Sequence, residues 1–399
     1  MEKNGPVMKQ LRNVIFQLHK WLGLNIAFFF VFMFITGALL TLSDEAEKLL
    51  HPSIRAEPAA KNMQASFGQI HDAIIAYDPG ATPFVIVHTP IEGAGDRTHA
   101  NASDGRKVLF WTDPTTAEVL AVTSQRNFKD IMHELHDSLL VPSRYVFLAV
   151  SATSFVLLYS VISGLIAYRR FWRGFLRVPS KGADIRAKWG AWHRLLGVWL
   201  APFLLIIGVT GGYFFLGGLN LNGKVPQPPM TEARQSVRPA GFDGAQIDKG
   251  LQALVEAYPD FVGNTAILPA THQQGLRFGG WMGEPSRLVL HTGAVDPVTL
   301  DALGMVSTQD NGGLSAIKQL MNVLHFGTWG GTLTRYLWVV LALYSGLLVM
   351  AGTIIYAGRS TRGSSGSPAV AWRGLGIVKW GYVALALGVL AMLVLRVIL

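Results

Sequence analysis

Five long apolar segments alternate with polar connections along this chain, and the alternation is the main guide to its architecture. The apolar segments predict helices at residues 14–42, 144–168, 194–216, 333–357 and 377–398. The first four match or exceed the roughly 20 residues that an α-helix needs to cross hydrocarbon. Half of the residues are hydrophobic and 15% are charged, a balance typical of membrane proteins. The chain is therefore predicted to cross a membrane several times.

Lys and Arg residues gather in the short segments that flank these helices. The segment between the second and third helices has a large excess of Lys and Arg over a single acidic residue, Asp184. Such clusters mark the cytoplasmic ends of membrane helices, so the two long connections are predicted to lie outside. The predicted order is N-terminus and first helix (1–42), first external segment (43–143), second helix (144–168), basic inner loop (169–193), third helix (194–216), second external segment (217–332), fourth helix (333–357), inner linker (358–376) and fifth helix (377–399).

The net charge of +9 follows from this topology. Nucleic-acid-binding proteins carry their charge on one folded face, whereas here it lies in membrane-flanking loops, so no nucleic-acid partner is expected. The chain contains no cysteine. Disulfides, iron–sulfur clusters and thioether-attached haem are thereby excluded.

Both external segments predict a helix followed by short strands. In the first, residues 67–77 predict a helix, and residues 83–88, 107–111 and 118–122 predict strands around a turn at 113–116. In the second, residues 247–258 predict a helix and residues 287–291 a strand, followed by a turn at 296–299. Adjacent Asp and Pro favour type I turns between paired strands. Each segment is therefore predicted to be a small α+β module.

A short phrase occurs twice, 174 residues apart, at the start of two apolar segments: His19-Lys20-Trp21-Leu22-Gly23 and His193-Arg194-Leu195-Leu196-Gly197. Each histidine is followed 18 residues later by a glycine, Gly37 or Gly211. Eighteen residues are five helical turns, which places histidine and glycine on one face about 27 Å apart. A duplicated four-helix core is the simplest interpretation, with the fifth helix outside the repeat.

A second pair of histidines also recurs, because His136 precedes Arg144 and the second helix as His325 precedes Arg335 and the fourth. Two-fold symmetry would bring equivalent residues together, so each pair can place two imidazoles on opposite sides of one macrocycle. Neutral imidazole is a common axial ligand of haem iron. The sequence therefore favours two haems, held by His19 with His193 and by His136 with His325.

Several other residues are candidates near these cofactors. Gly37 and Gly211 would make room for a porphyrin, although small residues also allow tight helix packing. Arg144 and Arg335 suit haem propionates or lipid headgroups. His133 has no counterpart, since Asn322 occupies the equivalent position, and it is a lower-ranked substitute ligand.

Motifs for other redox cofactors are absent from the sequence. It contains no phosphate-binding glycine loop, no dinucleotide fingerprint and no His-Glu-x-x-His zinc helix. The electron donor is therefore expected to be a quinol, a flavin or a separate reductase. His88 and His291, on predicted strands, are candidates for a binding cleft.

The chain resembles the PepSY-associated transmembrane family. The resemblance covers about residues 10–360 and rests on the two helix-leading histidine phrases, the Thr-Gly pairs at 36–37 and 210–211, and the motifs Tyr77-Asp78-Pro79-Gly80 and Asp113-Pro114-Thr115-Thr116. It implies an α-helical membrane bundle with two periplasmic α+β PepSY-like modules. Within the family, the chain is similar to bacterial inner-membrane ferric-siderophore reductases.

That similarity implies two b-type haems, ligation by the four repeated histidines, and transfer of electrons to siderophore-bound Fe(III). Two other functions stay open. PepSY modules also occur in peptidase propeptides, so the chain can be a non-catalytic regulator of a periplasmic peptidase. It can also be a transporter of haem or a metal complex, although transporters place ionisable residues in mid-membrane and the central thirds of the first four helices carry essentially none.

Overall fold

A computed structural model gives the fold of most of the chain. The structure describes residues 5–60, 63–89, 91–168, 173, 175, 185–223, 227–229, 241–269, 275–285, 287–310, 312–360, 372–373, 376 and 378–398. Most of the basic inner loop at 169–184 and most of the linker at 361–377 lie outside the described residues.

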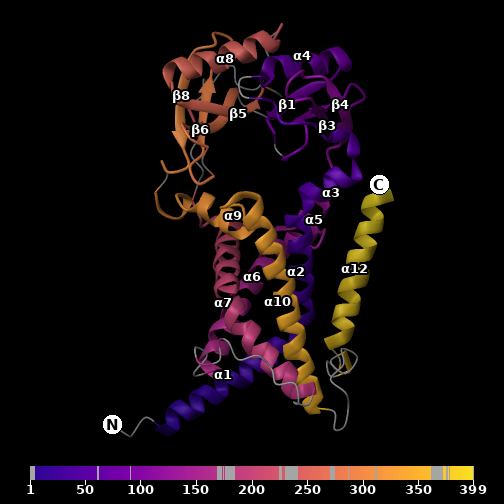
Figure 1. Cartoon of the computed structure of the whole chain (residues 1–399), viewed down its shortest axis with the longest axis vertical. Coiled ribbons are helices and arrows are strands. Elements are labelled where there is room, and N and C mark those ends of the chain that lie inside the picture. The colour runs from indigo at the N-terminus through magenta and orange to yellow at the C-terminus, as the bar shows by residue number, and fades with distance from the viewer. Residues whose placement is uncertain are drawn as a thin grey trace. The chain divides into compact units, whose positions relative to one another are not determined.

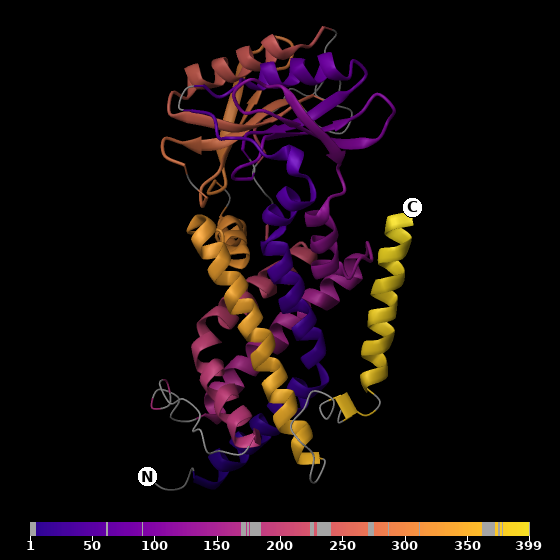
Figure 2. The ribbon, with the colours of Figure 1, turned by 45° about the vertical axis from the view of Figure 1, so that its right-hand side comes forward.

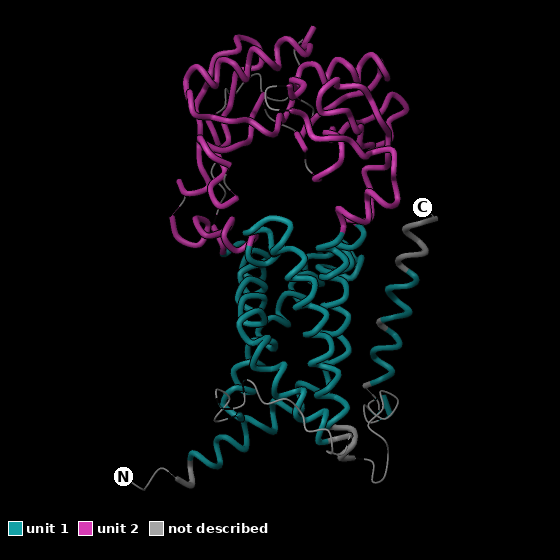
Figure 3. Tube along the Cα trace, in the orientation of Figure 1, with its two compact units in different colours: residues 1–42, 131–221, 324–399 teal, residues 43–130, 222–323 magenta. Residues whose placement is uncertain are grey.

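The chain folds as two compact units, each built from separate stretches of sequence (Figure 3). The membrane unit consists of residues 1–42, 131–221 and 324–399, and the sheet unit consists of residues 43–130 and 222–323. The chain therefore passes from the membrane unit to the sheet unit and back twice.

The membrane unit is helical (Figure 1). Its helices are α1 (Gly5–Asn25), α2 (Ala27–Thr41), α6 (Arg144–Ala167), α7 (Ile185–Gly218), α10 (Gly331–Ser360) and α12 (Val378–Ile398), with α5 (Phe128–Ser138) and α9 (Lys318–Phe326) at the links to the sheet unit. Within the described residues, three helices are long and apolar enough to cross a membrane, and the bent α1–α2 pair makes a fourth span if it is counted as one. The protein is thus a multi-pass membrane protein.

Two predicted helix boundaries differ from the structure. The first predicted helix, 14–42, is two helices that meet at Ile26 with a bend of 62°. Gly23 and Asn25 favour a bend because both are weak helix formers. The third helix starts at Ile185, nine residues before the predicted start at 194. Hydropathy detected only its apolar part, and its polar first turns shorten the predicted basic loop.

The spanning helices pack through small residues and aliphatic side chains. α6 packs on α7, and α10 packs on both α2 and α7 (Figures 1 and 2). At the α6–α7 contact, a side chain added to Gly208 would meet Leu158 at 2.7 Å, and one added to Gly211 would meet Ser154 at 2.8 Å. Small residues let membrane helices approach closely, and Gly211 has this packing role.

The fifth predicted helix is α12, whose Tyr382 contacts the bend of the first span. The Tyr382 hydroxyl donates a hydrogen bond to the Asn25 carbonyl, and its ring lies 5.4 Å from the Phe28 ring. The bend disturbs the regular hydrogen bonds of the helix, and a donor from α12 satisfies a carbonyl there.

The sheet unit is one antiparallel sheet of eight strands in the order β4-β3-β2-β1-β5-β6-β7-β8. Its strands are β1 (Thr82–Val87), β2 (Asp96–Asn101), β3 (Lys107–Thr112), β4 (Val119–Ser124), β5 (Phe261–Ile267), β6 (Leu276–Met282), β7 (His291–Val295) and β8 (Ala302–Ser307). α4 (Phe67–Tyr77) and α8 (Gly244–Ala257) lie along one face, over a core that includes Ile86, Phe110 and Phe278 (Figures 1 and 2).

The two predicted modules are therefore halves of a single sheet, because β1 pairs with β5 between Val85–Val87 and Thr265–Ile267. β2, β5, β6 and β8 were not predicted, since they carry charged residues or glycines instead of an apolar alternation. The predicted strand at 287–291 is four residues early, because β7 starts only at His291.

The starts of α4 and α8 form a reciprocal joint. The Gly68 amide donates to Asp248 of α8, and the Gly244 amide donates to Asp72 of α4, each over 2.9 Å. Ser66 adds a hydrogen bond of 2.6 Å to Asp248. Carboxylates stabilise the positive, N-terminal end of a helix dipole. Each half of the sheet unit thus supplies the carboxylate at the N-terminus of the helix in the other half.

Glycine at positions 68 and 244 allows this close approach. A side chain on Gly68 would collide with the Gly244 carbonyl and Asp248. We expect Gly68→Ala to destabilise the sheet unit by about 1–3 kcal/mol through overpacking. The measurement is thermal unfolding in detergent, followed by the fluorescence of the buried Trp111. Gly312→Ala is the control, because that position has open space and an ordinary φ of −76°; equal effects of both substitutions would contradict the expectation.

Candidate functional site

The first repeated histidine pair shares one cavity in the membrane unit. His19 on α1 and His193 on α7 both line a space of about 360 Å³, together with Lys20 and Arg194. Ligand pockets in proteins start at about 300 Å³ and are mostly apolar. Apart from these groups and the hydroxyls of Ser160 and Tyr168, the lining is aliphatic, aromatic or glycine. The cavity therefore suits a flat apolar ligand that carries acidic groups at one edge.

Five glycines leave the walls of this cavity without side chains: Gly23, Gly164, Gly190, Gly197 and Gly352. A Cβ atom on Gly164 would lie 3.5 Å from His19, and one on Gly352 would lie 2.8 Å from His193. The sequence did not single out Gly164 and Gly352 as site residues, because their spacing from the histidines of their own repeats is unequal. In the structure each faces a histidine from another helix.

The second pair, His136 and His325, lies ring against ring. The ring centres are 6.4 Å apart and the planes are inclined at 61°. An imidazole–metal bond is about 2 Å long and a ring nitrogen lies about 1 Å from its ring centre, so rings on opposite sides of one ion are about 6 Å apart. The observed spacing of the ring centres is close to this value.

Hydrogen bonds fix the tautomer of His193. Its Nδ1 atom lies 2.9 Å from the Leu348 carbonyl, which can only accept. Nδ1 therefore carries the proton of the neutral ring, and Nε2 keeps its lone pair. His19 is similar, since its Nδ1 lies 2.9 Å from the Ser163 hydroxyl, whose proton is directed to the Ser160 carbonyl at 3.2 Å. In both cases the carbonyl belongs to the residue four before a cavity glycine.

Two threonines do the same for the second pair. His136 Nδ1 lies 3.0 Å from the Thr36 hydroxyl, and His325 Nδ1 lies 2.8 Å from the Thr210 hydroxyl. Each hydroxyl proton is directed to a helix carbonyl, from Thr36 to Phe32 at 3.0 Å and from Thr210 to Ile206 at 2.8 Å. The hydroxyl oxygens therefore accept from Nδ1–H, and Nε2 is again the free nitrogen.

Burial also keeps the second pair neutral. Loss of hydration, strengthened by nearby imidazoles, lowers the pKa of His136 to about 4 and that of His325 to about 3. Both rings are therefore uncharged at neutral pH. A neutral imidazole with Nδ1–H hydrogen-bonded and Nε2 free is the form that binds metals in proteins.

The two Thr-Gly pairs serve different contacts in the two repeats. Gly37 lies against His136, because a Cβ atom there would be 3.1 Å from its ring. Gly211 instead contacts Ser154 on α6, as described above, and Phe214 of the same helix packs on His325 at 4.9 Å. Thr36 and Thr210 are the site residues that sequence reasoning missed, although the repeated Thr-Gly phrase was their signal.

The predicted arginines bond to helix ends. Arg144 donates to the Gly218 carbonyl at 2.6 Å, and Arg335 donates to the Thr41 carbonyl at 2.9 Å. These carbonyls end α7 and α2, so the positive charges complement the negative ends of two helix dipoles. His133 is half-exposed and lies 3.6 Å from Asp137.

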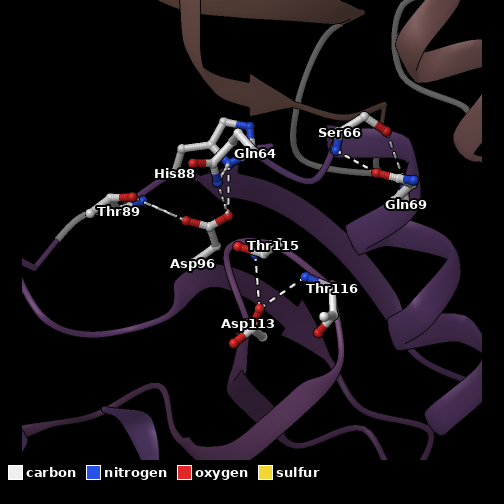
Figure 4. Close-up of polar contacts among 9 residues, drawn as sticks. All are labelled: Gln64, Ser66, Gln69, His88, Thr89, Asp96, Asp113, Thr115 and Thr116. Carbon is white, nitrogen blue, oxygen red and sulfur yellow. Dashed lines mark hydrogen bonds and ion pairs between the residues drawn. The ribbon is translucent and has the colours of Figure 1, made fainter. Parts of the chain in front are cut away.

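The remaining candidates, His88 and His291, lie in the sheet unit. His88 belongs to a polar cluster there (Figure 4). His88 Nδ1 lies 2.9 Å from the fully buried Asp96, which also accepts from Gln64 at 2.6 Å and from the Thr89 amide at 2.6 Å. The His88 ring stacks on Phe67 at 4.1 Å. These contacts tie the loop after β1 to β2. His291 lies on β7 of the same unit, apart from this cluster in the strand order.

Comparison with known proteins agrees with this architecture. The sequence model of the PepSY-associated TM region matches residues 16–359, which is most of the chain. The match includes all four repeated histidines. No curated protein matches the chain.

His99 on β2 makes the stability of the sheet unit depend on pH. Burial and the charge of Arg97 lower its pKa to about 4, from an ordinary value of about 6.5. The unfolded chain therefore takes up a proton first as the pH falls, and stability decreases between about pH 6.5 and about pH 4. We expect His99→Gln to weaken this decrease, as measured by unfolding midpoints across that range. An identical pH profile in His99→Gln would rule out this origin.

Proposed function

Because the chain belongs to the PepSY-associated transmembrane family, we propose that it is a di-haem oxidoreductase of the bacterial inner membrane. In this proposal it passes electrons across the membrane and reduces siderophore-bound Fe(III) to Fe(II) in the periplasm. The observation that carries the proposal is the shared state of four repeated histidines, His19, His193, His136 and His325. Each is held with Nδ1 engaged in a hydrogen bond and Nε2 free.

The residues present fit a b-type haem at each pair. His19 and His193 offer Nε2 atoms from two helices to one cavity, whose glycine walls suit a flat ring. Lys20 and Arg194 line the same cavity and would hold the propionate groups. At the other pair, the ring spacing of 6.4 Å suits one iron between His136 and His325. When bound, haem supplies a one-electron carrier of adjustable potential.

The protein contributes to the chemistry by orienting the histidine rings and by excluding water from them. The hydrogen bonds from Nδ1 fix ring rotation and tautomer, which strengthens metal binding by the other nitrogen. The apolar walls of the cavity keep water from the site, which preserves the strength of these contacts. Both rings of the His136–His325 pair are uncharged at neutral pH, which leaves each able to bind a metal through its free nitrogen.

The proposed reaction is a one-electron reduction. The electron comes from a quinol, a flavin or a separate reductase on the donor side, and the acceptor is Fe(III) held by the hard oxygen ligands of a siderophore. Hard oxygen ligands favour the more highly charged ion. The added electron lowers the charge of the iron, weakens its complex and leaves the chelator intact.

Removal of one ligand tests the proposal. We expect His193→Ala to lose one of two haems and to lose electron transfer, while the protein still inserts in the membrane. The measurement is a visible spectrum with haem stoichiometry, before and after dithionite and then a ferric chelate. The control is His51→Ala, because this histidine belongs to the sheet unit, its side chain is 42% exposed, and both haems should be kept.

Two results would contradict the proposal. Retention of two haems in His193→Ala would remove the assignment of that ligand. A colourless wild-type protein that folds normally would favour the regulatory alternative, in which the sheet unit restrains a periplasmic peptidase.

The absence of cysteine makes topology directly testable. We expect a cysteine placed at Ser103, in an exposed turn of the sheet unit, to react with a membrane-impermeant maleimide added outside the inner membrane. A cysteine at Gln10, exposed on α1, should react only after the membrane is opened, because the positive charges near it favour the cytoplasmic side. The reverse labelling pattern would overturn the proposed orientation.

A further inference from the structure

The first helix of the membrane unit, α1, carries a stripe of exposed apolar side chains. The stripe consists of Met8, Leu11, Val14, Leu18 and Trp21. Their spacings of three or four residues place them on one face of the helix. Between 42% and 61% of the surface of each is exposed, so the rest of the described chain leaves the stripe uncovered. A contiguous apolar surface of this kind marks a contact with something outside the chain.

The opposite face of α1 is polar and basic. It carries Lys9, Arg12, Asn13, Gln17 and Lys20. No Asp or Glu occurs among residues 5–25. In the part of the chain that the structure describes, Lys9 and Arg12 lie in no ion pair. An apolar stripe opposite uncompensated cations is typical of helices that lie in the surface of an anionic membrane.

The length of α1 and α2 together exceeds one membrane crossing. At 1.5 Å per residue the two helices extend about 55 Å, whereas the hydrocarbon layer is about 30 Å thick. α2 alone supplies about 22 Å of apolar helix, so only the last turns of α1 are needed to complete the crossing. The bend of 62° turns the rest of α1 away from the direction of the span (Figure 1).

Contacts with α6 place the middle of α1 near the end of a spanning helix. The Tyr159 hydroxyl donates to the Ile15 carbonyl at 3.1 Å, and His19 Nδ1 lies 2.9 Å from the Ser163 hydroxyl. Tyr159 and Ser163 precede the end of α6 at Ala167 by eight and four residues, or about 12 and 6 Å along the axis. Interfacial helices lie about 5–10 Å into the boundary between headgroups and acyl chains, so α1 has the depth of such a helix.

We propose that α1 lies in the membrane surface and binds anionic phospholipids. Its apolar stripe enters the acyl chains beside the bundle. Lys9 and Arg12 lie on the opposite face, and their aliphatic stems allow the charged groups to reach the phosphate oxygens of the headgroups. The inference goes beyond the proposed electron transfer, because it uses only the faces and the position of α1. Bound lipid holds in place the helix that carries His19.

Spin labels test the position of α1, because the natural chain contains no cysteine. Leu11→Cys and Leu18→Cys place a label on the stripe, and Asn13→Cys and Gln17→Cys place one on the polar face. Each full-length variant is reconstituted in vesicles that contain phosphatidylglycerol. We expect molecular oxygen, which concentrates among acyl chains, to relax the labels on the stripe. A water-soluble nickel complex should relax the labels on the polar face.

Three other labelling patterns would overturn the proposal. Access of the nickel complex to all four positions would place α1 in water. Exclusion of the nickel complex from all four would place α1 within a membrane span. Exclusion of both reagents from the stripe, together with dipolar coupling between labels, would show that a second copy of the chain covers it.

Quenching by brominated lipids tests the preference for anionic headgroups. A bimane label on Leu11→Cys is measured in vesicles with equal amounts of phosphatidylglycerol and phosphatidylcholine, of which only one is brominated. We expect brominated phosphatidylglycerol to quench more strongly. Lys9→Gln should lower this preference about fivefold, which corresponds to roughly 1 kcal/mol per cation at an anionic surface, and adding Arg12→Gln should lower it further.

Lys249→Gln is the control, because it removes an exposed positive charge from the sheet unit and should leave the preference unchanged. Equal quenching by the two brominated lipids in the labelled protein with both cations present would refute the anionic contact. The same preference before and after removal of Lys9 and Arg12 would also refute it. Neither measurement uses haem, so both outcomes are independent of the proposed oxidoreductase function.

Discussion

A neutral imidazole inside a helical bundle needs a partner for its N–H group, and this requirement organises the membrane unit. In an apolar medium an unsatisfied donor costs several kcal/mol. The four repeated histidines satisfy it across helix boundaries, because His19 of α1 bonds to α6, His193 of α7 to α10, His136 of α5 to α2, and His325 of α9 to α7. The bonds that set the free nitrogen of each ring therefore also hold the bundle together.

Glycines complete this arrangement, because the absence of a side chain leaves space for the histidine rings. The Leu348 carbonyl is accessible to His193 because Gly352, one turn later, has no side chain, and the His19 ring lies against Gly164. A larger residue at position 352 would displace the His193 ring and leave the Leu348 carbonyl without this donor. Ligand geometry and helix packing thus depend on the same backbone positions.

The sequence predicted the features that depend on local pattern. Apolar length predicted the first four spanning segments, and the duplication predicted which histidines lie near each other. It did not predict the partners of those rings, since Gly164 and Gly352 lie on helices other than those of their histidines. Thr36 and Thr210 were visible as a repeat, but their role follows from a hydroxyl bonded back to its own helix, which spacing does not reveal.

In the sheet, local pattern was a weaker guide. β6 contains Gly279 and Gly280 and β2 contains Asp96 and Arg97, so both lack the alternation that predicts strands. Pairing of β1 with β5 joins residues about 180 positions apart, and nothing in either half alone specifies it. The sequence therefore predicted two α+β modules but not that β1 and β5 join them in one sheet.

The reciprocal joint between α4 and α8 has a consequence for how the chain is made. The start of α4 is completed by Asp248, which the ribosome adds only after α6 and α7 have been synthesised. The first half of the sheet therefore lacks its partner strand β5, and one edge of β1 stays unpaired, while two helices insert in the bilayer. Long-range pairing of this kind is slow and leaves strands open to wrong partners, so this interval is when the nascent protein depends most on chaperones.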